Sequence, residues 1–128
     1  DPGLRRILTL QAARGYYLAG NYGEAKNIYR MALREDFSSD APDIHFGLAE
    51  VCEAVSEDQE AIREYLAAAG LYTQDPRLSA RSFLRAAKLC EDKEDYHEAL
   101  KIYMRVVERF PSLPESGVAR ERMEAIKK

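Results

Sequence analysis

One sequence frame recurs three times along the chain, and it constrains the fold more than any other feature. The spacing Glu-Ala-x-x-x-Tyr stands at residues 24–29, 60–65 and 98–103. Its alanines, Ala25, Ala61 and Ala99, are 36 and then 38 residues apart. Because residues four positions apart lie on one face of a helix, each copy predicts a helix that presents a small residue beside a ring. Self-similarity at such a period indicates a stacked repeat architecture.

A second apolar segment of helical character precedes each copy, at residues 4–19, 41–55 and 77–92. Two slots recur in these segments. The slot twelve residues before the repeated alanine holds Ala13, Ala49 and Ala87, and the slot nine residues before it holds Tyr16, Cys52 and Cys90. Each repeat is therefore predicted to be a pair of helices.

Helix-breaking residues separate the predicted pairs, in "REDFSSDAP" (34–42), "YTQDPRLS" (72–79) and "RFPSLPESG" (109–117). Pro42, Pro76 and Pro114 each suit a first helical position, and Asp75 suits the cap before Pro76. A last segment, 114–128, has one narrow apolar stripe amid charge and is expected to close the stack. About seven helices are predicted, and the fold class is all-α.

Charge and hydrophobicity narrow the function classes. The 128-residue chain has a net charge of −3, with 46% hydrophobic and 32% charged residues. Nucleic acid is not an expected partner, because its binders carry a basic stripe. The longest apolar stretch, 66–72, is far shorter than the ~20 residues that span a bilayer, so this segment is expected to be soluble and not to insert into a membrane.

The repeats resemble the tetratricopeptide repeat (TPR) family. The resemblance covers residues 6–113. It rests on residues that match the family's characteristic small, aromatic and proline positions, which are Ala13, Tyr16, Gly20, Tyr22, Ala25, Tyr29 and Ala32 in the first repeat and Ala87, Tyr96, Ala99, Tyr103 and Pro111 in the third. It implies a right-handed α-solenoid of antiparallel helix pairs. The expected organisation is a single domain, 1–128, with repeats at 6–39, 42–75 and 80–113 and a capping helix at 114–128. Two departures are Ser56 and Glu94, which stand where the family turns on a glycine such as Gly20.

Residues that could carry chemistry have structural explanations. Cys52 and Cys90 fill one slot in adjacent repeats, which places them too far apart for a disulfide and favours two small buried thiols. His45 is expected to be packed or at an interface, and His97 solvated. The acidic runs 57–60 and 91–95 lie at predicted turns and helix starts, where carboxylates favour the helix dipole. We expect no catalytic residue, no metal site and no cofactor.

The resemblance implies a partner-binding groove lined by the first helix of each pair. The family's groove slots fall on Ile7, Leu10, Arg14, Tyr17, Phe46, Glu50, Glu53, Arg81, Leu84, Lys88 and Glu91. One slot is apolar in every repeat, at Leu10, Phe46 and Leu84, and is expected to be open to an apolar helix face or an extended peptide. Core packing of these three is the alternative. Family members that bind carboxylate tails of heat-shock chaperones use Lys, Asn and Arg there, so that activity is not expected.

Three functions remain open at this point. The first is a non-catalytic scaffold that binds a protein or peptide within a larger assembly. The second is architectural self-association into a homo-oligomer, through the apolar row or the N-terminal face at Leu4 and Leu8. The third is a helical-repeat RNA binder, which the acidic groove residues Glu50, Glu53 and Glu91 disfavour. The last ~30 residues look like closing repeats of bacterial envelope proteins of the TPR family, which favours a periplasmic location over a cytoplasmic one.

Overall fold

The computed structural model describes residues 1–35, 38–70 and 75–128. Over these residues the chain forms seven α-helices, one 3-10 turn and no strand. The all-α prediction and the predicted number of helices are therefore confirmed. Parts of the two interior breaker segments, 36–37 and 71–74, lie outside the described residues.

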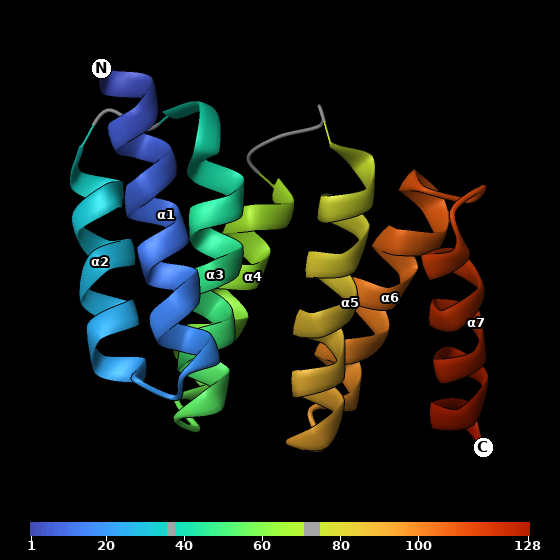
Figure 1. Ribbon diagram of the computed structural model, residues 1–128. Helices are drawn as coiled ribbons and strands as arrows, with labels where there is room; N and C mark the ends of the chain where they lie inside the picture. The colour runs from blue at the N-terminus through green and yellow to red at the C-terminus, as the bar shows by residue number, and fades with distance from the viewer. Residues whose placement is uncertain (36–37, 71–74) are drawn as a thin grey trace. The chain divides into compact units, whose positions relative to one another are not determined.

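The chain divides into two compact units, residues 1–64 and 65–128. Unit 1 contains α1 (Pro2–Leu18), α2 (Tyr22–Arg34), the turn η1 (Ser38–Asp40), α3 (Ala41–Ala54) and the first half of α4 (Asp58–Gly70). Unit 2 contains the rest of α4, then α5 (Pro76–Asp92), α6 (Tyr96–Arg109) and α7 (Pro114–Lys127) (Figure 1). The boundary falls inside the second predicted repeat, and the single domain over 1–128 stays a prediction.

Proline and aspartate start the first helices of the pairs as the sequence predicts. Pro76 and Pro114 are the first residues of α5 and α7, whereas α3 begins one residue before Pro42. The Asp75 carboxylate accepts a hydrogen bond from the backbone N–H of Leu78 at 3.1 Å. This bond satisfies one of the backbone N–H groups of the first helical turn, which have no carbonyl acceptor within the helix.

The turn inside each pair has one backbone geometry in all three repeats. Gly20, Ser56 and Glu94 have φ angles of 84°, 63° and 61°, in the left-handed region. The N–H of the next residue donates to the carbonyl five positions back, in Asn21 to Tyr16, Glu57 to Cys52 and Asp95 to Cys90, at 2.8–2.9 Å. This is the Schellman ending of a helix. The fold thus requires a left-handed residue there even where the sequence offers no glycine.

The repeated Ala and Tyr residues are buried in every copy, as predicted for packing positions. In unit 1, Ala25, Tyr29 and Ala32 form the buried stripe of α2, which packs on α1 and α3. The ring of Tyr29 lies against Gly47 of α3, where an added Cβ would stand 2.4 Å from Tyr29 Cζ. A glycine is therefore required by close approach in the middle of α3.

In unit 2 the equivalent stripe of α6 is Ala99, Tyr103 and Val106, and α6 packs on α5 and α7. The last helix also contacts α5. Its buried residues include Ala119 and Met123, which belong to the narrow apolar stripe predicted for the last segment. The capping helix consequently occupies the place of a first helix of a further pair.

The slot shared by Tyr16, Cys52 and Cys90 differs between repeats. Cys52 and Cys90 are free, buried thiols, which confirms the prediction for both. Burial raises the pKa of Cys52 to about 11 and also raises that of Cys90. Tyr16 is 39% exposed instead of buried, because α1 is the first helix of unit 1 and is packed mainly on α2.

Candidate functional site

In unit 1 the predicted groove residues of α1 and α3 form a connected polar group. Arg14 Nη1 donates to Glu50 Oε1 at 2.8 Å, joining α1 to α3. The Arg14 guanidinium also lies 5.2 Å from the centre of the Tyr17 ring, and that ring is 5.8 Å from the ring of Tyr22. Glu50 is buried, so its charge is compensated by Arg14 rather than by water.

The apolar row is not open along its whole length. Leu10 and Leu84 are half-buried, but Phe46 is only 8% exposed. The expectation of an open slot at Phe46 was therefore wrong. The reason is the position of α3, which contacts both α1 and α2 and buries nine of its fourteen residues. Among the other groove residues of unit 1, Ile7 is exposed and Glu53 half-buried.

Unit 2 contains a cavity of about 490 Å³ between α5, α6 and α7. Four predicted groove residues, Arg81, Leu84, Lys88 and Glu91, line it. The remaining lining residues are Arg85, Asp92, Tyr103, Pro114, Glu115, Val118 and Arg122. A volume of this size is typical of ligand pockets and holds several side chains of a bound peptide.

A hydrogen-bonded group fixes one wall of this cavity. Arg122 of α7 forms an ion pair with Glu91 of α5, and the Tyr103 hydroxyl of α6 donates to Glu91 Oε1 at 2.8 Å. The Arg122 hydrogen bond holds the pKa of Glu91 below its usual value. Burial and the Glu91 acceptor raise the pKa of Tyr103. Three helices are thus joined at one carboxylate.

A second carboxylate at the cavity is less well satisfied. Glu115 of α7 is buried, and its Oε1 has no hydrogen-bond partner among the described residues. The other oxygen, Oε2, lies 3.8 Å from Arg77 Nε. Sequence reasoning missed Glu115, Val118 and Arg122, because it assigned α7 only to capping. The signal that could have found them is the proline start that α7 shares with α5, which marks a first helix.

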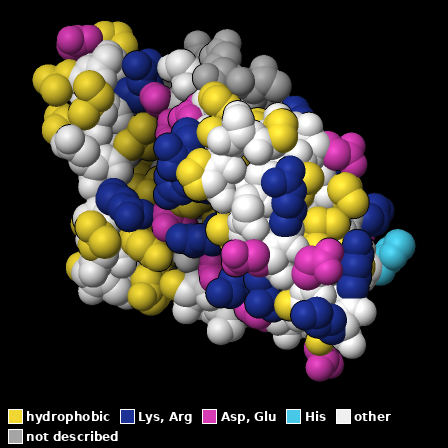
Figure 2. Space-filling view, turned by 90° about the vertical axis from the view of Figure 1, so that its right-hand side faces the viewer, with side chains coloured by type: hydrophobic (Ala, Val, Ile, Leu, Met, Phe, Trp, Pro, Cys, Tyr) yellow, Lys and Arg dark blue, Asp and Glu magenta, His cyan; other side chains and the backbone are white. Residues whose placement is uncertain are grey.

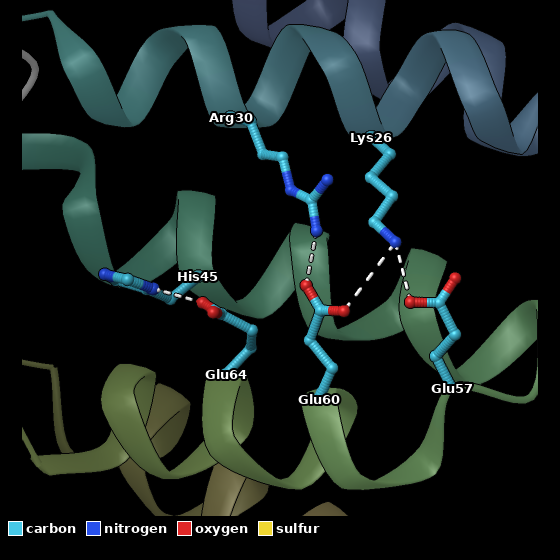
Figure 3. A network of polar contacts seen from close by, with 6 residues as sticks. All are labelled: Lys26, Arg30, His45, Glu57, Glu60 and Glu64. Atoms are coloured by element: carbon cyan, nitrogen blue, oxygen red, sulfur yellow. Dashed lines mark hydrogen bonds and ion pairs between the residues drawn. The ribbon is translucent and has the colours of Figure 1, made fainter.

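A polar network joins α2, α3 and α4 in unit 1 (Figure 3). Lys26 Nζ of α2 lies 2.7 Å from Glu57 Oε2 and 3.7 Å from Glu60 Oε2, while Arg30 Nη2 donates to Glu60 Oε1 at 2.6 Å. The Arg30 hydrogen bond lowers the pKa of Glu60. His45 Nδ1 of α3 lies 2.6 Å from Glu64 Oε1, so this histidine is at a helix interface, as expected. His97 is exposed, as expected.

The most metal-like group in the described part of the chain is Cys52, Glu57 and Glu60, whose ligand atoms lie within 4.8 Å of one another. Lys26 already supplies the positive charge between the two carboxylates. The pKa of Cys52, raised to about 11 by burial, also disfavours the thiolate that would bind a metal. The network is therefore best explained as structural.

Two further hollows lie away from the predicted groove. One, of about 410 Å³, lies between α6 and α7 and is lined by His97, Leu100, Lys101, Met104, Arg105, Met123 and Lys127. The other, of about 480 Å³, lies on α1 beside Leu4 and Leu8. Figure 2 looks onto the α7 side of unit 2, where basic and acidic side chains are intermixed with scattered hydrophobic ones. Of the helices that the structure describes, none has the length and apolar character to cross a bilayer.

A comparison with protein-family models matches residues 22–112 to the family described as "SNAP: Soluble NSF attachment protein, SNAP". No curated protein matches the chain significantly. The matching model is not that of a TPR family, although the helix-pair fold is TPR-like.

Solved structures share the fold. The Yersinia enterocolitica type III secretion chaperone SycD, in complex with a peptide of the translocator YopD, superposes with a TM-score of 0.78 at 22% identity, over 99% of this chain and 94% of that one. An alternative dimer of SycD gives 0.76 at 22% identity, over 95% and 91%. PcrH in complex with the chaperone-binding region of PopB gives 0.71 at 15% identity, over 95% and 94%.

Proposed function

Since the chain belongs to the soluble NSF attachment protein (SNAP) family, we propose that it is a non-catalytic scaffold that binds a peptide or a helix of a protein partner. Its three helix pairs are, in this proposal, TPR units within that family. The bound segment enters the cavity between α5, α6 and α7 in unit 2, where the predicted groove residues Arg81, Leu84, Lys88 and Glu91 lie. SycD and PcrH, which share the fold, have each been crystallised with a segment of another protein.

The observation that carries the proposal is the composition of the unit 2 cavity. Leu84, Pro114 and Val118 supply apolar contact area, and charged groups surround them. Val118 is 47% exposed although it lies on the cavity side of α7. An apolar side chain of a partner would bury these groups, while its backbone and polar side chains contact the surrounding charges, as is usual for peptide grooves.

The same cavity favours a peptide over a reacting substrate or an RNA. Its only aromatic lining residue, Tyr103, is buried and hydrogen-bonded to Glu91, so the cavity offers no accessible ring for a base. RNA binders need basic grooves with accessible rings for stacking. The Tyr103 hydroxyl donates to the Glu91 carboxylate but is buried, so this pair is not open to a reacting substrate.

The test is selection of binding peptides from a displayed random library on the intact protein, followed by affinity measurement with variants. Leu84→Glu should weaken the selected peptides by ~10-fold or more, because it places a charge on the apolar floor. Met104→Glu, at the hollow on the other side of α7, is the matched control and should leave binding unchanged. The proposal would be contradicted if all the selected peptides were insensitive to Leu84→Glu in a protein of unchanged helicity and melting temperature.

Self-association is the second candidate, favoured by one specific observation. Leu4, Ile7 and Leu8 on α1 are each more than half exposed, which is unusual for three neighbouring large apolar residues. Light scattering over a concentration series measures the mass directly. A concentration-dependent dimer that Leu4→Glu with Leu8→Glu abolishes would support this alternative, and a constant monomer mass would exclude it.

A further inference from the structure

The first half of α4 shows how a second helix packs on the preceding pair in unit 1. Residues 58–64 lie against α2 and α3, and three acidic side chains near this segment meet basic ones there (Figure 3). Lys26 and Arg30 come from α2 and His45 from α3. In unit 1, α4 is therefore held on α2 partly by the ion pairs of Lys26 and Arg30, and on α3 by the contact of His45 with Glu64.

The α6 and α7 helices in unit 2 repeat the arrangement that α2 and α3 have in unit 1. In unit 1, α3 packs on α2 and contacts α1; in unit 2, α7 packs on α6 and contacts α5. The place that corresponds to α4 is therefore the surface between α6 and α7. The 410 Å³ hollow lies at this place.

The repeat frame identifies which residues replace the basic residues of α2. Lys26 and Arg30 correspond, 36 and then 38 residues further on, to Leu100 and Met104. Leu100 is half-buried and Met104 is 39% exposed. In unit 2, apolar side chains therefore occupy the positions whose charged equivalents hold α4 in unit 1. Met123 of α7 extends this apolar surface across the hollow.

Basic residues border this apolar floor. Lys101 and Arg105 come from α6 and Lys127 from α7, and none of the seven lining residues is Asp or Glu. Glu98 lies 3.7 Å from Lys101, but both side chains are exposed, and such a pair contributes little. In a chain whose net charge is −3, this is a local concentration of positive charge around an apolar floor.

We propose that the surface between α6 and α7 is a second docking site, which binds an amphipathic helix of a protein partner whose apolar stripe is flanked by Asp and Glu. The partner helix takes the place that α4 has in the preceding pair, with its stripe on Leu100, Met104 and Met123. Its carboxylates pair with Lys101, Arg105 and Lys127. This site is separate from the cavity of the proposed function, so the two can fail independently.

Charge argues against a second copy of the chain as the occupant. Two copies joined through this surface would bring its basic residues together. The exposed apolar face of α1 carries Arg5 and Arg6, which pair with Glu35 and Asp40, so it offers this surface no excess of negative charge. Helix-in-groove docking is governed by an apolar stripe at i, i+3, i+4 and i+7 with complementary flanks, and an acidic partner meets both conditions.

The experiment uses the whole chain and two fluorescein-labelled helical peptides. The first has Leu at every third or fourth position and Glu at the flanking positions; the second has Lys in place of each Glu. Fluorescence polarisation should show the Glu peptide binding ~10-fold or more tightly than the Lys peptide, although the protein is acidic overall. Met104→Glu and Arg105→Glu should each weaken the Glu peptide by ~10-fold or more.

Two controls make the result specific. Arg120→Glu reverses an exposed charge of α7 outside the hollow and should change affinity little, and Leu84→Glu tests the cavity of the proposed function and should also have little effect. Equal affinity for the two peptides, or equal effects of Arg105→Glu and Arg120→Glu, would overturn the proposal. A dimer in light scattering that Met104→Glu dissociates would overturn it as well, because it would make a second copy the occupant.

Discussion

Gly47 in the middle of α3 gives the sharpest test of how the repeats pack. An alanine Cβ there would stand 2.4 Å from Cζ and 2.5 Å from the hydroxyl oxygen of Tyr29. Ordinary contact begins near 3.4 Å, so the ring would have to move by roughly 1 Å. Tyr29 is only 5% exposed, and a ring in a close-packed interior cannot move this far without displacing its neighbours.

The magnitude follows from two opposing effects. Overpacking of a core costs about 1–3 kcal/mol. Replacing glycine by alanine inside a helix stabilises by about 1 kcal/mol when nothing is in contact. Gly47→Ala should therefore lower the free energy of unfolding by up to about 2 kcal/mol. Gly117→Ala in α7 is the control, because no atom lies within 4 Å of its added Cβ, and it should raise the free energy by about 0.5–1 kcal/mol.

Urea unfolding followed by circular dichroism measures both variants, and the slope of the transition shows whether the unfolded state has changed. Gly47→Ala in a Tyr29→Leu background isolates the contact, since the smaller side chain leaves room for the new methyl group. The destabilisation should largely disappear there, with a coupling energy of about 1–3 kcal/mol. If Gly47→Ala were as stabilising as Gly117→Ala, the close approach of α2 and α3 inferred from the ring position would be wrong.

Three other predictions concern the turns and the titrating groups. Ser56→Gly and Glu94→Gly should each stabilise the protein by about 1 kcal/mol in urea unfolding, because they relieve a left-handed backbone, whereas Gly20→Ala should destabilise it by a similar amount. Burial raises the pKa of Cys52 to about 11, so the folded protein keeps a proton that the unfolded chain releases above pH 9.0. The difference in unfolding free energy between wild type and Cys52→Ala should therefore be constant below pH 9.0 and shrink as the pH rises toward 11. A difference that stays constant over this range would count against burial as the cause of the raised pKa. Arg122 lowers the pKa of Glu91 from 4.5. Arg122→Gln should therefore reduce the free energy of unfolding at neutral pH, and this reduction should become smaller as the pH falls below 4.5. A reduction that does not depend on pH would exclude the ion pair as its source.

The sequence predicted the helices and the packing stripe because these depend on local periodicity. The recurrence of Ala25, Ala61 and Ala99 places the stripe on the second helix of each pair without any knowledge of tertiary contacts. The shared turn geometry was not predicted, because Ser56 and Glu94 stand where the first repeat has Gly20. Proline starts and the Asp75 cap follow from backbone groups that lack partners at a helix end.

The candidate site was predicted only in part. Arg81, Leu84, Lys88 and Glu91 were expected on the groove side of α5, and they line the cavity of unit 2. The other half of that cavity comes from α7, whose spacing does not continue the repeat frame. Phe46 was expected to be open, but its burial depends on which helices cover α3, and a single-helix pattern does not contain that information.

By itself the sequence determined an all-α chain of three helix pairs and a closing helix, because the 3.6-residue periodicity and the repeat spacing are properties of the chain alone. Only the tertiary structure decided that the ring of Tyr29 needs Gly47 and that Glu91 joins α5, α6 and α7. Tertiary structure also decided that apolar and basic side chains of α6 and α7 meet at one hollow. These features arise from side chains far apart in sequence, and their positions are set by how the helices pack on one another.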